Sequence, residues 1–113
     1  MTGTTPSTFY VRLSLMVPKR GCAERVSSIT DELLEYFSKQ PGYVRGYKLT
    51  TSDGSGELGR LTVWTSEQEA DRVATSEHVL AVRSELMQLI EEDSHVERSF
   101  TAFDPQLAKA AAS

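Results

Sequence analysis

The chain has 113 residues, of which 39% are hydrophobic and 25% are charged, and its formal net charge is −4. This length allows one compact domain, and the composition is ordinary for a globular protein. A net acidic charge gives no electrostatic reason to expect nucleic acid or an anionic membrane as a partner. Cys22 is the single cysteine, so an intramolecular disulfide is excluded and a reducing compartment is favoured.

The sequence predicts neither a signal peptide nor a membrane helix. The first residues, MTGTTPST, lack the basic and apolar regions of a signal peptide. No apolar run approaches the ~20 residues that a membrane helix needs, so we expect a cytoplasmic protein that does not enter the membrane. We expect residues 1–8 to be a disordered tail, residues 9–104 to form the domain and residues 105–113 to be a second tail.

The first half of the chain predicts a strand and then a helix. Hydrophobic alternation from Phe9 to Val17 is typical of a strand. Its two faces carry Phe9, Val11, Leu13, Leu15 and Val17 on one side and Tyr10, Arg12, Ser14 and Met16 on the other. From Cys22 the apolar spacing becomes helical, and Pro41-Gly42 ends that helix.

The second half predicts a hairpin, two helical segments and a last strand. Residues 43–51 and 57–65 alternate as strands around a Gly-rich loop, with Tyr43 and Tyr47 on the same face. Ser66 and Glu69 form a capping box that opens a helix. This helix is expected to break near Thr75-Ser76, and the second segment to run to about residue 92. Residues 95–103 alternate as the fourth strand.

The order strand–helix–strand, repeated twice, predicts an α+β fold of the ferredoxin-like, split βαβ class, with a four-stranded antiparallel sheet and its helices on one face. We expect Trp64 and Val11 to face the helices, and Tyr10 and Met16 to lie on the opposite face with Leu61 and Val63. An uncovered apolar face favours a homodimer in which two sheets pack together, a dimeric α+β barrel. The alternative is a mixed, partly polar open face.

Three segments resemble the antibiotic biosynthesis monooxygenase-like family of dimeric α+β barrels over roughly residues 9–103: LTVWTSEQEA, SEHVLAVRSEL and PGYVRGYKL. The resemblance implies a ligand cleft between the sheet and the helices. Its cofactor-free members oxidise polycyclic phenols with molecular oxygen, in a pocket that favours the deprotonated substrate. A haem-degrading branch holds haem through a helix histidine, a strand-one asparagine and the strand-three tryptophan.

The resemblance can be followed position by position. The strand-three tryptophan matches Trp64, whereas the strand-one asparagine of the haem branch falls at Val11 and its histidine at Arg83. In the phenol-oxidising branch, an asparagine four residues before the tryptophan falls at Arg60. Valine cannot donate a hydrogen bond and a guanidinium does not ligate iron, so we expect neither haem nor any other cofactor.

We take Trp64, Arg60 and His78 as candidate catalytic residues. Trp64 would stack on a flat ligand, or is simply a core residue. Arg60 needs an anionic ligand, an internal acid such as Glu57, Glu85 or Glu97, or a path for its head group to water. His78 lies near the helix break and is the better placed general base, unless it is merely exposed.

We expect Arg83, Tyr47 and Val11 to line the substrate site. Arg83 is either a surface arginine or, if it turns inward, clamps a phenolate or carboxylate together with Arg60. His95 follows an acidic run and is expected to be solvated. Neither histidine has a metal-ligand partner at a suitable spacing, so we expect no metal site. Three functions stay open: a cofactor-independent monooxygenase acting on an aromatic or enolisable small molecule, a non-catalytic small-molecule-binding or stress-related dimer, and a barrel whose interior is filled.

Overall fold

The structure, a computed structural model, describes residues 8–106. Seven elements follow one another in this range: β1 (Thr8–Met16), α1 (Ala23–Ser38), β2 (Tyr43–Thr50), β3 (Leu58–Trp64), α2 (Glu67–Ala74), α3 (Glu77–Leu89) and β4 (Val96–Phe103). The order predicted from the sequence is confirmed. Thr8 already belongs to β1, and the remainder of the expected N-terminal tail, with residues 107–113, lies outside the described residues.

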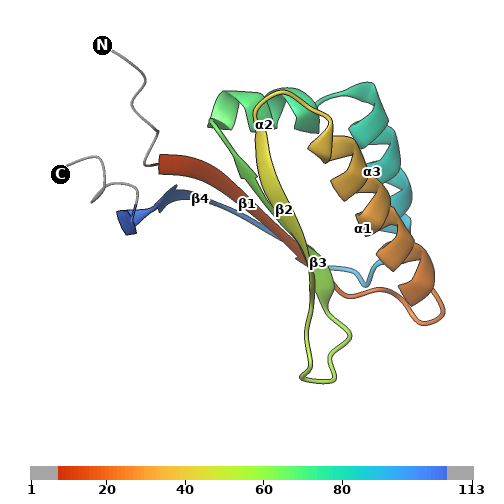
Figure 1. The fold of residues 1–113 in the computed structure, drawn as a ribbon. Helices are drawn as coiled ribbons and strands as arrows, with labels where there is room; N and C mark the ends of the chain where they lie inside the picture. The colour runs from red at the N-terminus through yellow and green to blue at the C-terminus, as the bar shows by residue number, and fades with distance from the viewer. Residues whose placement is uncertain (1–7, 107–113) are drawn as a thin grey trace, which may run out of the picture.

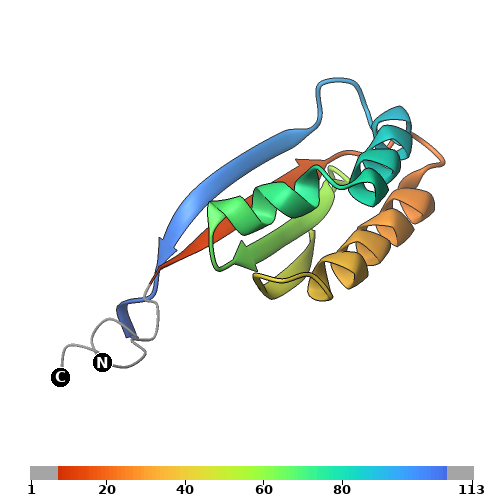
Figure 2. The same ribbon diagram turned by 90° about the horizontal axis from the view of Figure 1, so that it is seen from above.

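The four strands form one antiparallel sheet in the order β2-β3-β1-β4. All three helices lie on the same side of this sheet (Figure 1), so the predicted ferredoxin-like α+β fold is confirmed. Seen from above, β4 is the edge strand and lies outside the area that the helices cover (Figure 2). One face of the sheet is therefore roofed by helices, and we call the other one the open face.

The part of the roof that follows β3 consists of two short helices, α2 and α3, because a second N-cap begins a new helix after α2. Ser66 accepts a hydrogen bond from the Glu69 amide at 3.3 Å and begins α2. Ser76 accepts one from the Val79 amide at 3.4 Å and begins α3, which confirms the predicted break. The turn at Ser76 lets α2 and α3 lie at different places over the sheet, as Figure 2 shows.

The sequence alone assigned the wrong side of β1 to the helices. In antiparallel pairing, residues opposite one another share a face. Tyr10, Arg12, Ser14 and Met16 pair with Trp64, Thr62, Arg60 and Leu58. Tyr10 and Met16 therefore face the helices with Trp64, and Val11 lies on the open face opposite Val63. Alternation divides a strand into two faces, but only the register decides which one meets the helices.

A bulge in β2 produces a second difference. Tyr43 pairs with Trp64, but Arg45 already pairs with Val63, so two steps along β2 match one step along β3. The extra residue reverses the alternation after Tyr43. Tyr47 consequently pairs with Leu61 and lies on the open face, rather than on the face of Tyr43 as the alternation predicted.

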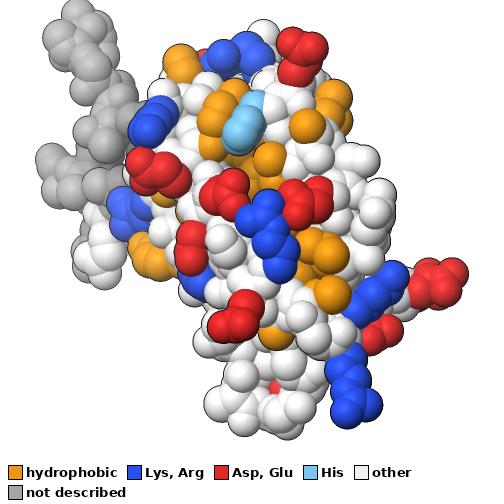
Figure 3. Space-filling view, turned by 90° about the vertical axis from the view of Figure 1, so that its right-hand side faces the viewer, with side chains coloured by type: hydrophobic (Ala, Val, Ile, Leu, Met, Phe, Trp, Pro, Cys, Tyr) orange, Lys and Arg blue, Asp and Glu red, His pale blue; other side chains and the backbone are white. Residues whose placement is uncertain are grey.

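The hydrophobic core lies between the helices and the sheet. Its members come from α1, α2, α3 and from the roofed face, and include Met16, Val26, Ile29, Leu33, Trp64, Val73, Val79 and Leu86. The outer surface of the helices carries acidic and basic side chains interspersed with small apolar spots (Figure 3). Within residues 8–106, no helix has both the length and the apolar character needed to cross a bilayer.

Candidate functional site

A small cavity lies between the roofed face and the helices α2 and α3. Its polar lining comes from the strands and from α3 and consists of Arg12, Ser14, Arg60, Thr62, Arg83 and Glu97. Its apolar lining consists of Phe37, Trp64, Ala70, Ala74 and Val79. The cavity measures about 30 Å³. A space of this size holds about two water molecules, so the structure shows the site closed.

Arg60 is the most unusual residue in this cavity. Its side chain is 7% exposed, and its Nη1 atom has no hydrogen-bond partner among the described residues. The guanidinium lies over the ring of Phe37, with Cζ 5.6 Å from the ring centroid. Burial lowers the pKa of Arg60 to about 10, so the group is still a cation at neutral pH. A buried cation with an unused donor is poised to bind an anion.

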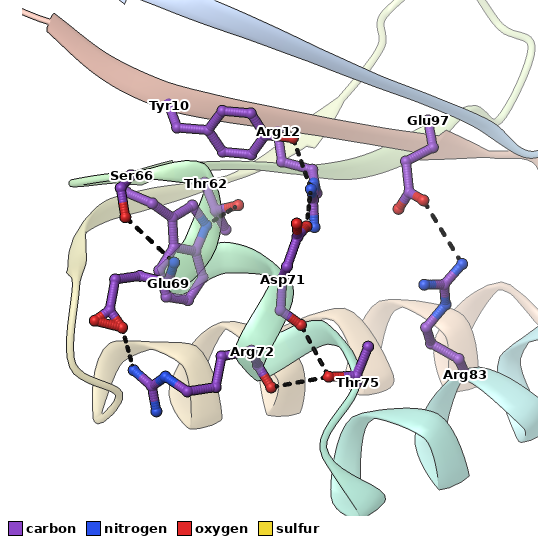
Figure 4. A network of polar contacts seen from close by, with 11 residues as sticks. Tyr10, Arg12, Thr62, Ser66, Glu69, Asp71, Arg72, Thr75, Arg83 and Glu97 are labelled. Carbon is purple, nitrogen blue, oxygen red and sulfur yellow. Dashed lines mark hydrogen bonds and ion pairs between the residues drawn. The ribbon is translucent and has the colours of Figure 1, made fainter.

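Two ion pairs join the strands to the helices beside the cavity (Figure 4). Arg12 of β1 donates to the carboxylate of Asp71 on α2 at 2.9 Å and to the hydroxyl of Tyr10 at 2.7 Å. Arg83 of α3 lies 3.7 Å from the carboxylate of Glu97 on β4. Arg83 is partly exposed and lines the cavity, and a carboxylate already neutralises it, in contrast to Arg60.

Trp64 belongs both to the core and to the cavity wall. It is 2% exposed and packs edge-on against Phe37 and Tyr43, with centroid distances of 5.8 and 5.6 Å. Its indole Nε1 donates to Thr62 Oγ1 at 2.9 Å. With its only donor engaged, Trp64 can shape the cavity but offers a ligand no further hydrogen bond.

The histidine next to the cavity is His95, not His78. His95 Nε2 lies 3.1 Å from Ser14 Oγ. Ser14 lines the cavity and is the residue of β1 that pairs with Arg60 of β3. His95 is half-buried, which corrects the expectation that it is solvated. Burial lowers the pKa of His95; nearby Arg83 and Arg60 act in the same direction and Glu97 opposes them.

The other predicted site residues lie elsewhere. His78 is exposed on α3 and stacks on Tyr36 of α1, with ring centroids 4.3 Å apart. Val11 and Tyr47 line a shallow depression on the open face. The structure therefore brings Trp64, Arg60 and Arg83 together around one cavity, and separates them from His78, Val11 and Tyr47.

Sequence reasoning missed Arg12, Ser14 and His95 as residues at or beside the cavity. The polar pair in β1 was a usable signal, because Arg12 and Ser14 interrupt one face of an otherwise apolar strand. His95 had no local signal, since its partner Ser14 is 81 positions away in the chain. Within residues 8–106 no group of three or more His, Cys, Asp or Glu side chains is arranged to hold a metal ion.

Comparison with known proteins finds similarity at the level of structure. No protein-family model and no curated protein sequence matches the chain. A mutant form of SnoaB, a cofactor-independent oxygenase from Streptomyces nogalater, is 22% identical, with a TM-score of 0.72 over 86% of this chain and 94% of that one. Rv0793 from Mycobacterium tuberculosis is 16% identical, with a TM-score of 0.76 over 85% and 96%.

A third similar structure, provisionally named an antibiotic biosynthesis monooxygenase, comes from Nitrosomonas europaea. It is 15% identical, with a TM-score of 0.73 over 92% of this chain and 96% of that one. Identities this low carry the fold and not the reaction. The chain has the fold of the antibiotic biosynthesis monooxygenase-like proteins.

Proposed function

We propose that this protein is a cofactor-independent monooxygenase whose substrate is an aromatic or enolisable small molecule, bound as its anion at Arg60. The observation that carries the proposal is the buried guanidinium of Arg60, which lines the cavity and whose Nη1 atom has no hydrogen-bond partner among the described residues. A site that binds the anion more tightly than the neutral molecule lowers the substrate pKa. The fold shared with a cofactor-independent oxygenase supports this choice of chemistry.

The residues would divide the work as follows. Arg60 holds the phenolate or enolate oxygen, and the electron-rich anion itself reduces molecular oxygen. Trp64 and Phe37 supply aromatic walls against which a flat ring can pack. Arg83 adds positive potential across the cavity while it remains paired with Glu97. Fixed charge placed where negative charge develops is the main contribution that such a site makes to the rate.

Substrate entry requires the cavity to open, because about 30 Å³ is too small for an aromatic ring. The ion pairs Arg12–Asp71 and Arg83–Glu97 connect the sheet to α2 and α3 beside the cavity. Both are partly exposed, and pairs of this kind are worth only ~0–1 kcal/mol each. We propose that they separate when the substrate enters and close again over it.

A binding protein without turnover is the second candidate. The same Arg60 would bind an anion, and the small volume of the cavity suits a small ligand. Oxygen consumption separates the two functions, whereas anion binding is common to both. A barrel with a filled interior would show neither.

The test is oxygen uptake with a panel of anthrones and hydroquinones, together with binding of 4-nitrophenol, whose anion is coloured. The wild-type protein should consume oxygen with at least one substrate, and Arg60→Ala should lower kcat/KM by about a hundredfold. Arg20→Ala, a change in an exposed turn, is the matched control and should behave like wild type.

The outcomes are distinct. Formation of the nitrophenolate anion without oxygen uptake from any substrate would favour the binding protein. If Arg60→Ala keeps both its activity and its anion binding, Arg60 is not part of the site. A homodimer formed through the open face, and residence in the cytoplasm, belong to the same proposal.

A further inference from the structure

We infer that Ser14 and His95 form a proton relay that carries the substrate proton from the buried cavity to the outside of the molecule. This inference rests on the proposed function, because it names the route of the proton that the substrate loses. His95 would be the general base, and the Ser14 hydroxyl would connect it to the substrate.

The first observation is the position of Ser14 between two spaces. Ser14 is 1% exposed, lines the cavity that holds Arg60, and pairs with Arg60 across the β1–β3 ladder. On its other side, Ser14 Oγ is hydrogen-bonded to His95 Nε2 at 3.1 Å. A hydroxyl both donates and accepts, so Ser14 can pass a proton on without keeping it.

The second observation is that His95 itself lines a separate depression on the surface. This depression measures about 410 Å³ and is formed by the end of α3 and the loop before β4. It carries the acidic side chains of Glu91, Glu92 and Asp93. The imidazole is therefore connected to the cavity through Ser14 and reaches water on a surface whose charge attracts a released proton.

The transfer balances with these groups alone. The substrate O–H or C–H gives its proton to Ser14 Oγ, while the hydroxyl proton of Ser14 moves to His95 Nε2. The substrate is left as an anion beside Arg60, and His95 becomes an imidazolium that can give a proton to water in the depression. No other bond forms or breaks in this step.

The charges around His95 decide whether it can accept the proton. The groups that face it are Glu97 from β4, Arg60 from β3, Arg83 from α3, and around the depression Lys19, Glu91, Glu92 and Asp93. Burial and the two arginines lower the pKa of His95, so that the neutral ring, which is the proton acceptor, prevails at neutral pH. His78, exposed and stacked on Tyr36, has no such route to the cavity.

Three variants test the relay. His95→Gln can keep the hydrogen bond to Ser14 but cannot carry a proton, and Ser14→Ala removes the connection. His78→Gln is the matched control. With a substrate that wild type oxidises, both relay variants should lower kcat by about a hundredfold, and His78→Gln should stay within about twofold of wild type. His95→Gln should also remove the acid limb of the kcat pH profile. Thermal melts verify that each variant is folded.

A second readout does not need turnover. Below the pKa of free 4-nitrophenol, stopped-flow mixing with wild type should form the coloured anion quickly, and Ser14→Ala and His95→Gln should form it about tenfold more slowly, because the proton has lost its route out of the cavity. Should wild type oxidise a substrate while both relay variants keep full kcat, the relay would be overturned and the oxygenase retained. If no substrate is oxidised, the oxygenase is lost, and the rate at which the nitrophenolate anion forms alone upholds or overturns the relay.

Discussion

Arg60 and its surroundings show a conflict between stability and function at a single residue. Its guanidinium is desolvated, and its Nη1 atom is unpaired in the described part of the chain. Glu97 attracts it, but Arg83 and Arg12 repel it. Such a group does not serve the fold, since an apolar side chain of similar length would fill the same space without a charge to bury.

Arg60→Met should therefore stabilise the protein and abolish its anion binding. Removing the buried charge should raise the free energy of unfolding by about 2 kcal/mol. Urea denaturation at one fixed protein concentration measures this change. Arg60→Lys, which keeps a charge at the position, should show no such gain. A clear loss of stability in Arg60→Met would mean instead that the attraction to Glu97 and the Phe37 ring outweighs the desolvation of the cation.

His95 should make the stability depend on pH in the acid range. Its pKa is lowered in the folded state, first by burial, so the unfolded chain takes up this proton at a higher pH than the folded chain does. The stability is therefore intact above the ordinary histidine pKa of about 6.5 and falls as the pH drops from there through the folded-state pKa. His95→Gln should show a shallower fall below pH ~6.5 than wild type in urea titrations, and His78→Gln should not.

At the scale of elements, two serines determine how the roof of the cavity is divided. Ser66→Ala and Ser76→Ala should each lower the free energy of unfolding by about 1 kcal/mol, because each removes an N-cap acceptor. Ser84 lies exposed in the interior of α3, where Ser84→Ala should raise helix stability slightly. Urea denaturation of the three variants, compared at the same concentration, checks the prediction. Equal effects of Ser76→Ala and Ser84→Ala would contradict it.

The roof should also respond to the loss of its ion pair to the sheet. Asp71→Asn weakens the contact of α2 with Arg12, which is partly exposed, so its cost in stability should stay below about 1 kcal/mol. Binding of 4-nitrophenol should become several-fold faster in stopped-flow measurements, because the cavity opens more readily. Asp31→Asn, which weakens the exposed ion pair of α1 with Lys48, is the control and should leave the rate unchanged. An unchanged rate in Asp71→Asn would show that entry follows another path.

Elements and caps could be predicted because their causes are local. The strand alternation, the Pro41-Gly42 stop and the two capping serines each lie within a few residues of what they determine. The face of β1 and the placing of Tyr47 could not be predicted, because they depend on the register with β3 and on the β2 bulge. Arg60 and Trp64 lie just before the cap of α2 and could be found from the local sequence. His95 could not, because its partner Ser14 is distant in the chain.

At the scale of the whole molecule, the corrected register makes the open face more apolar than the sequence suggested. Four apolar side chains of β1 point there, together with apolar residues of each other strand: Phe9, Val11, Leu13, Leu15, Tyr47, Leu49, Leu61, Val63, Val96, Phe100 and Ala102. Tyr47, Val96 and Phe100 are 50%, 41% and 40% exposed in the single chain. The helix side, by contrast, is covered with interspersed charges (Figure 3).

The single chain therefore exposes apolar side chains from all four strands, interrupted by Arg45 and Arg98, and a second copy of the same chain can cover this surface through a two-fold axis. We expect wild type to sediment as a dimer at micromolar concentration. Phe100→Lys should convert it to a monomer, because a second cation would be buried beside Arg98 between the two sheets. Leu80→Lys changes a residue that is 52% exposed on the outer side of α3 and should leave the dimer intact. If wild type sediments as a single chain, or Phe100→Lys remains a dimer, the open face is not the surface through which two copies meet.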